Sequence, residues 1–205
     1  YEERTLKAAA FVLQEKIAYD LNVAREVLQQ TGTLSFNRET VEWQTINQFT
    51  RSQSHIRLPR MVIGNIWLGQ NYSINKTTPV VDKVKELVGG TCTIFQRMNE
   101  QGDMLRVATN VINTDQNRAI GTYIPVINPD GVPNPVLEKI LRKERYTGRA
   151  VVLDRMYITA YEPILDANAN VIGVLYVGIP EELAESHRKE IMNIKVGKTG
   201  YIYIL

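Results

Sequence analysis

The sequence predicts an α+β domain in which helices pack on one antiparallel sheet. Three observations favour this class. The chain opens with a long stretch of helical periodicity, its middle consists of short apolar runs separated by turn residues, and residues 148–179 contain three consecutive strand-like segments. With 205 residues, the chain can bury one sizeable hydrophobic core. We therefore expect one main domain.

The first element is predicted to be a helix over residues 3–30. Its apolar residues recur at spacings of three and four, which places them on one face: Leu6, Ala10, Leu13, Ile17, Leu21, Ala24 and Leu28. Gly32 follows and suits a left-handed cap. We assign residues 1–34 to this helical segment.

The segment over residues 37–58 is polar and harder to interpret. Trp43, Ile46 and Phe49 are spaced by three, which favours a short helix lying on the core by one aromatic edge. A helix over part of this segment is therefore the expectation.

The remaining elements follow from apolar runs and turn residues. An apolar run at 60–69 precedes a predicted helix at 79–88, which ends at two glycines, and the runs at 91–98 and 103–112 form a hairpin around NEQG. A second helix is predicted at 135–145. Strands at 148–155, 156–165 and 171–179 then form a meander, with DANAN as the last turn. These elements belong to a module at 35–180.

The end of the chain is predicted to start a second module. Residues 181–193 read as a charged connecting helix, and residues 194–205 open a further strand without a partner, so we group 181–205 together. The chain starts without an initiator Met and stops within this strand, and we expect it to be a piece of a longer protein. It contains no run of 18 apolar residues that could span a membrane.

Composition argues against several other functions. The 24 basic and 22 acidic side chains nearly balance, which does not favour nucleic-acid binding. Cys92 is the single cysteine and reads as a buried strand residue, and with only His55 and His187 beside it we expect no metal site, no cofactor and no nucleophilic catalysis. The GKTG sequence is not a phosphate loop, because Met192 stands where that motif needs glycine. We expect a protein that is not an enzyme.

Seven segments, in order, carry a resemblance to a known family. They are LPRMVIGNIWL, VDKVKELVGGTCTIFQRMN, MLRVATNV, RAIGTYI, YTGRAVV, YITAYEPILDANANVIGVLYVGIP and IKVGKTGYIYI. The chain resembles the Cache sensor domains, specifically the class in which a Cache-3-type module is fused to a Cache-2-type one. The resemblance is closest over residues 58–180. Only the opening segment of the second module is present.

The resemblance implies a PAS-like sheet with a long N-terminal helix and further helices covering it. It also implies an extracytoplasmic position between transmembrane helices of a bacterial or archaeal chemotaxis transducer or histidine kinase, with a possible homodimer through the first helix. Such a module binds a small molecule. The alternative is a structural or protein-interaction module that responds to a periplasmic binding protein. Pocket closure would pull on the last strand, which leads into the 181–193 helix.

The candidate ligand-binding residues lie on strands and loops around the expected cavity of the sheet. Alternation puts Tyr157, Thr159 and Tyr161 on one face, opposite Ile158, Ala160 and Glu162. Guanidinium groups suit bidentate capture of a carboxylate, and the resemblance implies a small anionic or zwitterionic metabolite. The full set of predicted ligand contacts is Arg106, Arg118, Thr122, Tyr123, Arg149, Tyr157, Thr159 and Tyr161.

Each of these residues has an alternative interpretation. Strand arginines are often paired with a local acid, and strand tyrosines are often core residues with a satisfied hydroxyl. Arg106 has the least support among the arginines, and alternation would place it on a face with Met104, Ala108 and Asn110.

Overall fold

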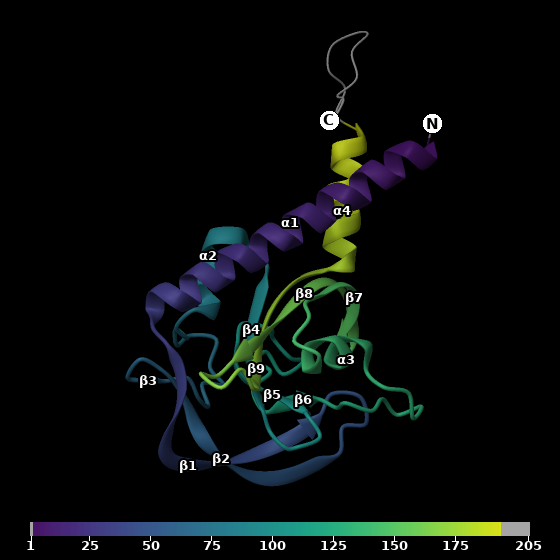
Figure 1. The fold of residues 1–205 in the computed structure, drawn as a ribbon. Coiled ribbons are helices and arrows are strands. Elements are labelled where there is room, and N and C mark those ends of the chain that lie inside the picture. Colours follow the sequence, from purple (N-terminus) through teal and green to yellow (C-terminus); the bar gives the residue numbers. More distant parts are fainter. Residues whose placement is uncertain (1, 194–205) are drawn as a thin grey trace.

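The computed structural model describes residues 2–193, with side chains described for 10–186, 189 and 190. Figure 1 shows the order of its elements along the chain. They are α1 (Glu2–Thr31), β1 (Leu34–Asn47), β2 (Gln53–Ile63), β3 (Ile66–Trp67), α2 (Val81–Val88), β4 (Thr91–Arg97), β5 (Met104–Thr109), β6 (Thr122–Ile124), α3 (Pro135–Leu141), β7 (Tyr146–Val152), β8 (Arg155–Leu165), β9 (Val171–Pro180) and α4 (Glu181–Asn193).

The strands form one curved sheet in the order β3-β2-β1-β6-β5-β4-β9-β8-β7. Neighbouring strands are antiparallel, apart from the short parallel pair of β1 with β6. The hairpin of β4 with β5 and the meander of β7, β8 and β9 form as predicted. The predicted class, an α+β domain with a PAS-like antiparallel sheet and a long N-terminal helix, is confirmed.

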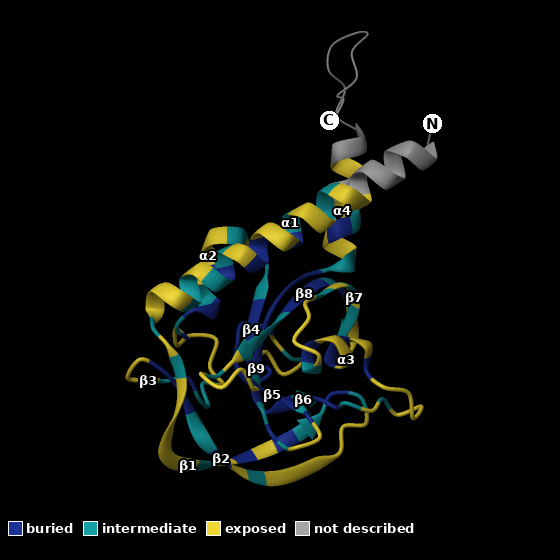
Figure 2. Ribbon diagram, in the orientation of Figure 1, coloured by how far each residue is buried: buried dark blue, intermediate teal, exposed yellow. Residues whose placement is uncertain are grey.

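The two faces of the sheet bury two separate apolar clusters. Helices α1 and α2 cover one face, and α3 covers the other, as Figures 1 and 2 show. Alternation along the strands divides the side chains between the clusters: Ile94 lies on the α1 face and Phe95 on the α3 face, and Leu175 and Tyr176 divide in the same way. The α3 face therefore holds the aromatic side chains that are relevant to ligand binding.

The stripe predicted on α1 makes contact with the sheet over its central part. Ile17, Leu21 and Ala24 are buried in the cluster of the α1 face. Beside them, Arg25 donates to Glu162 of β8 at 2.7 Å. The helix is thus fixed to the meander by both apolar packing and an ion pair.

The helix predicted within residues 37–58 is wrong, because this segment forms the β1–β2 hairpin. Burial at the end of β1 has a period of two, with Trp43 and Thr45 buried and Glu42 and Gln44 exposed. The spacing of three among Trp43, Ile46 and Phe49 was therefore misleading. The Asn47 side chain accepts from the backbone N–H groups of Phe49 and Thr50, which stabilises the turn.

The chain leaves the sheet through α4. Pro180 ends β9 and Glu181 begins α4, so no linker separates the strand from the helix, and the predicted bounds of this helix are confirmed. The further strand predicted over 194–205 lies outside the described residues. No helix within residues 2–193 is long and apolar enough to cross a membrane.

Candidate ligand-binding site

A β-bulge places Arg106 and Ala108 on opposite faces of the sheet. The pairing of β4 with β5 shifts between Ile94 opposite Ala108 and Phe95 opposite Arg106, which leaves one extra residue on β5. As a result Ala108 packs in the cluster on the α1 face, whereas Met104 packs in the cluster on the α3 face. The expectation that Arg106 shares a face with Ala108 is therefore wrong, because simple alternation does not continue through a bulge.

Among the described residues, Arg106 is a buried cation without an acidic partner. Its exposed fraction is 1%, its Nη1 donates to the Thr122 hydroxyl, and its Nε has no hydrogen-bond partner in the described chain. The guanidinium carbon lies 4.8 Å from the centre of the Phe95 ring. Burial lowers the pKa of Arg106, and the groups that oppose this shift are tyrosines, not carboxylates.

Three tyrosines surround this cation. Tyr157, Tyr161 and Tyr176 interact with it electrostatically, and Tyr161 and Tyr176 pack with ring centres 4.9 Å apart. Burial raises the pKa of Tyr161 and of Tyr176, so both phenols stay neutral. The Tyr176 ring has room because Gly178 lacks a side chain: a Cβ there would be 2.1 Å from the Tyr176 oxygen. The Arg106 cluster is defined here as Arg106, Phe95, Thr122, Tyr157, Tyr161 and Tyr176.

Two cavities of about 410 Å³ each flank the Arg106 cluster. The first cavity is bordered by Tyr157 and by the basic side chains of Arg51, Lys85 and Arg155, against one acid, Asp154. The cavity volumes are within the range of small-molecule sites. We call this the basic cavity.

The second cavity lies between β7, the start of α3 and the β1–β2 turn. Tyr161 forms part of its wall, and no hydrogen bond joins the Tyr161 hydroxyl to another group in the part of the chain that is described. Its other walls are largely apolar, from Phe49, Ile124, Pro129, Val136 and Met156. We call this the apolar cavity. Arg106 itself lines neither cavity, whereas Tyr157 lines the basic cavity and Tyr161 lines the apolar cavity.

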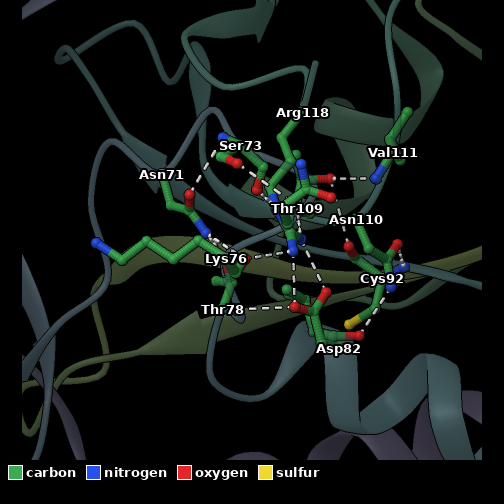
Figure 3. Close-up of polar contacts among 12 residues, drawn as sticks. Asn71, Ser73, Lys76, Thr78, Asp82, Cys92, Thr109, Asn110, Val111 and Arg118 are labelled. Atoms are coloured by element: carbon green, nitrogen blue, oxygen red, sulfur yellow. Dashed lines mark hydrogen bonds and ion pairs between the residues drawn. The ribbon is translucent and has the colours of Figure 1, made fainter. Parts of the chain in front are cut away.

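Arg118, a second predicted ligand contact, is buried in a different network (Figure 3). It makes a bidentate pair with Asp82, at 2.8 Å from Nη1 and 2.7 Å from Nη2. Its remaining donors reach the backbone oxygens of Ser73, Lys76 and Thr109 at 2.8 Å each. All five N–H donors of a guanidinium are thus engaged within the protein.

This network fixes the loop at 68–80 to the start of α2. Burial alone would raise the pKa of Asp82, but the hydrogen bonds and the charge of Arg118 outweigh it, so the pKa lies below its usual value. The two buried arginines therefore differ in their partners. Arg118 pairs with the Asp82 carboxylate and uses all five of its donors, whereas Arg106 pairs with no described carboxylate and has an unpaired Nε.

The other predicted contacts are distributed around the sheet. Thr122 touches Arg106, and its own hydroxyl donates to the Ala119 oxygen at 2.7 Å. Thr159 donates to the Gly148 oxygen at 2.7 Å. Tyr123 packs against the cluster on the α1 face. The structure thus brings together Arg106, Thr122, Tyr157 and Tyr161, and places Arg118 and Tyr123 elsewhere.

Arg149 is a special case among the predicted contacts. It borders the apolar cavity, and its Nε and Nη2 donate to the carboxylate of Glu181 at 2.8 Å and 2.9 Å. The same residue therefore belongs to the cavity wall and holds the first residue of α4.

The sequence also contained signals that were missed. Tyr176, which was missed, pairs directly with Tyr161; counting outward from the DANAN turn would have placed Leu175 there instead, because a bulge at Ile164 and Leu165 shifts the register by one residue. The position of Phe95 on the face opposite Ile94 could have been predicted from the alternation of side chains along β4. Gln48, which borders the apolar cavity, was missed because its segment was expected to be helical.

The geometry defines a class of protein: a PAS-like α+β domain with a charged, aromatic interior under one sheet face. Comparison with family models then gives the family. The model described as the Cache 3/Cache 2 fusion domain matches residues 3–205, and the chain belongs to this family of sensor domains found in signal-transduction receptors. No curated protein matches the chain.

One of the similar solved structures is the sensor domain of DcuS from E. coli. The two chains are 14% identical, with a TM-score of 0.37, and the alignment covers 54% of this chain and 70% of that one. The family assignment rests on the family model alone.

Proposed function

We propose that this domain senses a small anionic metabolite, of carboxylate type, through Arg106. The observation that supports it most is a guanidinium with 1% exposure, no acidic partner and an unpaired Nε. A charge buried without compensation is costly, and proteins normally pair it or neutralise it. A carboxylate ligand supplies the missing partner and accepts from the unpaired donor.

The Arg106 cluster also supplies neutral hydrogen-bond donors to the same anion. The hydroxyls of Tyr157 and Tyr161 are the nearest candidates, because each borders one of the two cavities. The basic cavity attracts anions and serves as the access route, whereas the apolar cavity holds the body of the ligand. Since Arg106 lines neither cavity, binding includes a rotation of Tyr157 or Tyr161, which line them.

The cellular setting of this proposal follows from the family. We place the domain outside the cell membrane, between the transmembrane helices of a chemotaxis transducer or histidine kinase, as a homodimer through α1. It has no catalytic role in this scheme.

A thermal-shift screen of small carboxylates, amino acids and amines tests the proposed function. We expect at least one carboxylate, and no simple amine, to raise the melting temperature. Binding at 100 times the dissociation constant contributes about 2.7 kcal/mol, which corresponds to roughly 5–10 °C for a domain of this size. A screen in which no carboxylate shifts the transition, while a protein partner does, would support the interaction module instead.

The Tyr161 hydroxyl is expected to contribute directly to binding. Tyr161→Phe removes one neutral hydrogen bond to the ligand and should weaken binding roughly tenfold, with little change in the unfolding midpoint because the hydroxyl has no described protein partner. Isothermal titration with the best carboxylate measures the effect. Tyr123→Phe is the matched control, since Tyr123 packs on the other face of the sheet. Equal affinities for Tyr161→Phe and the unmodified domain would remove Tyr161 from the site.

A further inference from the structure

Gln48 has a buried, unused hydrogen-bond acceptor beside the apolar cavity. The residue follows β1, is 2% exposed and forms part of the cavity wall. Its Nε2 donates to the backbone oxygen of Val151 on β7 at 3.4 Å, whereas its Oε1 is buried without a partner. A buried amide oxygen that accepts nothing carries a desolvation cost.

The orientation of this amide follows from its neighbour. An amide whose oxygen and nitrogen were exchanged would place Oε1 against the Val151 carbonyl oxygen, where two acceptors repel each other. The Val151 contact therefore keeps the amide nitrogen on the β7 side. The free group at this position is an acceptor, and its complement is an N–H or O–H donor.

The polar groups around the apolar cavity are mostly acceptors or already engaged. Arg149 has a partner in Glu181, and the amide nitrogen of Asn134 donates to Asn128. Asp130 adds a carboxylate at the exposed rim. The apolar cavity thus differs from the basic cavity, which contains three basic side chains.

We propose that the apolar cavity selects a carboxylate that also carries a hydroxyl or ammonium group, which donates to Gln48 Oε1. This inference rests on the proposed function, because it assigns the second polar group of the same ligand. Gln48 would then recognise the hydrogen-bond donor of the ligand, and Arg106 would recognise its carboxylate. A site built around a buried acceptor discriminates strongly against a ligand that lacks the donor.

Two matched ligand series test the inference by isothermal titration on the unmodified domain. One compares propionate with lactate, 3-hydroxypropionate, alanine and β-alanine, and the other compares succinate with malate and aspartate. We expect at least one substituted acid to bind tenfold or more tightly than its unsubstituted parent. In Gln48→Met, which has a similar volume and no acceptor, this ratio should fall to near one. Gln44→Met, which replaces an exposed glutamine on β1 four residues before Gln48, is the control and should keep the ratio.

The outcomes separate this inference from the function on which it rests. If no carboxylate of either series binds, the proposed function loses its support. If carboxylates bind but the substituted acids bind no tighter than their parents, only the role of Gln48 is overturned. A ratio that survives in Gln48→Met also overturns it, because another group then recognises the donor.

Discussion

The substitution Arg106→Met is expected to abolish ligand binding without destabilising the free domain. Loss of a buried charge-assisted partner weakens binding by roughly 100-fold or more. The free energy of unfolding should stay the same or rise by about 1–3 kcal/mol, because an apolar side chain of similar length replaces a buried cation that has no acidic partner. Urea unfolding and isothermal titration with the best carboxylate measure the two effects.

Thr122 is the residue most directly affected by this change. It loses the Arg106 donor but keeps its own hydrogen bond to the Ala119 oxygen, so its hydroxyl remains satisfied. Destabilisation by several kcal/mol in Arg106→Met, or unchanged affinity, would show that the guanidinium serves the fold and not a ligand.

The same substitution at Arg118 is expected to have the opposite result. Arg118→Met removes the Arg118 donors from three backbone oxygens and from the Asp82 carboxylate, which keeps the Thr78 N–H. Breaking one side of a buried pair costs about 3–5 kcal/mol, and we expect a loss of up to this size because Asp82 is partly exposed. Urea unfolding measures this loss. Arg142→Met, which breaks the exposed pair with Glu138 on α3, is the control and should cost less than about 0.5 kcal/mol. A small loss in Arg118→Met would contradict a structural role for the network.

The stability that Asp82 contributes should depend on pH in a definite direction. Its pKa is lower in the folded chain than in the unfolded one, so the stabilisation is fully present above the unfolded value and is lost as the pH falls through the folded value. The cost of Arg118→Met should therefore be larger at neutral pH than at about pH 3. An equal cost at both pH values would contradict the carboxylate's part in it.

The fold could be predicted largely from local patterns. The meander, the β4–β5 hairpin, α1, α2 and α4 follow from apolar periodicity and turn residues and form close to where they were expected, whereas the helix predicted at 135–145 ends at Leu141. The β1–β2 hairpin could not be recognised because its outer residues are polar and its buried positions are few. The buried residues Trp43 and Thr45 show the period of two that is typical of a strand. Ile46 and Phe49 follow Trp43 at a spacing of three, which is typical of a helix and obscured that pattern.

The site was less accessible to sequence reasoning, because the decisive differences arise between distant residues. Arg106 and Arg118 look alike in the sequence, yet Arg118 pairs with Asp82, which lies 36 positions earlier, whereas Arg106 contacts no acid in the part of the chain that is described. The bulge on β5 also depends on the pairing with β4, which alternation alone does not reveal. The shared face of Tyr157 and Tyr161 was predictable, because it depends only on the alternation of one strand.

The contact of Arg149 with Glu181 has a thermodynamic consequence. A ligand group that draws the Arg149 guanidinium into the apolar cavity would take it away from Glu181 in the first turn of α4. Ligand binding and the position of α4 would then be energetically coupled. Such coupling is reciprocal. Under the proposed function, a restraint on α4 would therefore also change the affinity of the apolar cavity for its ligand.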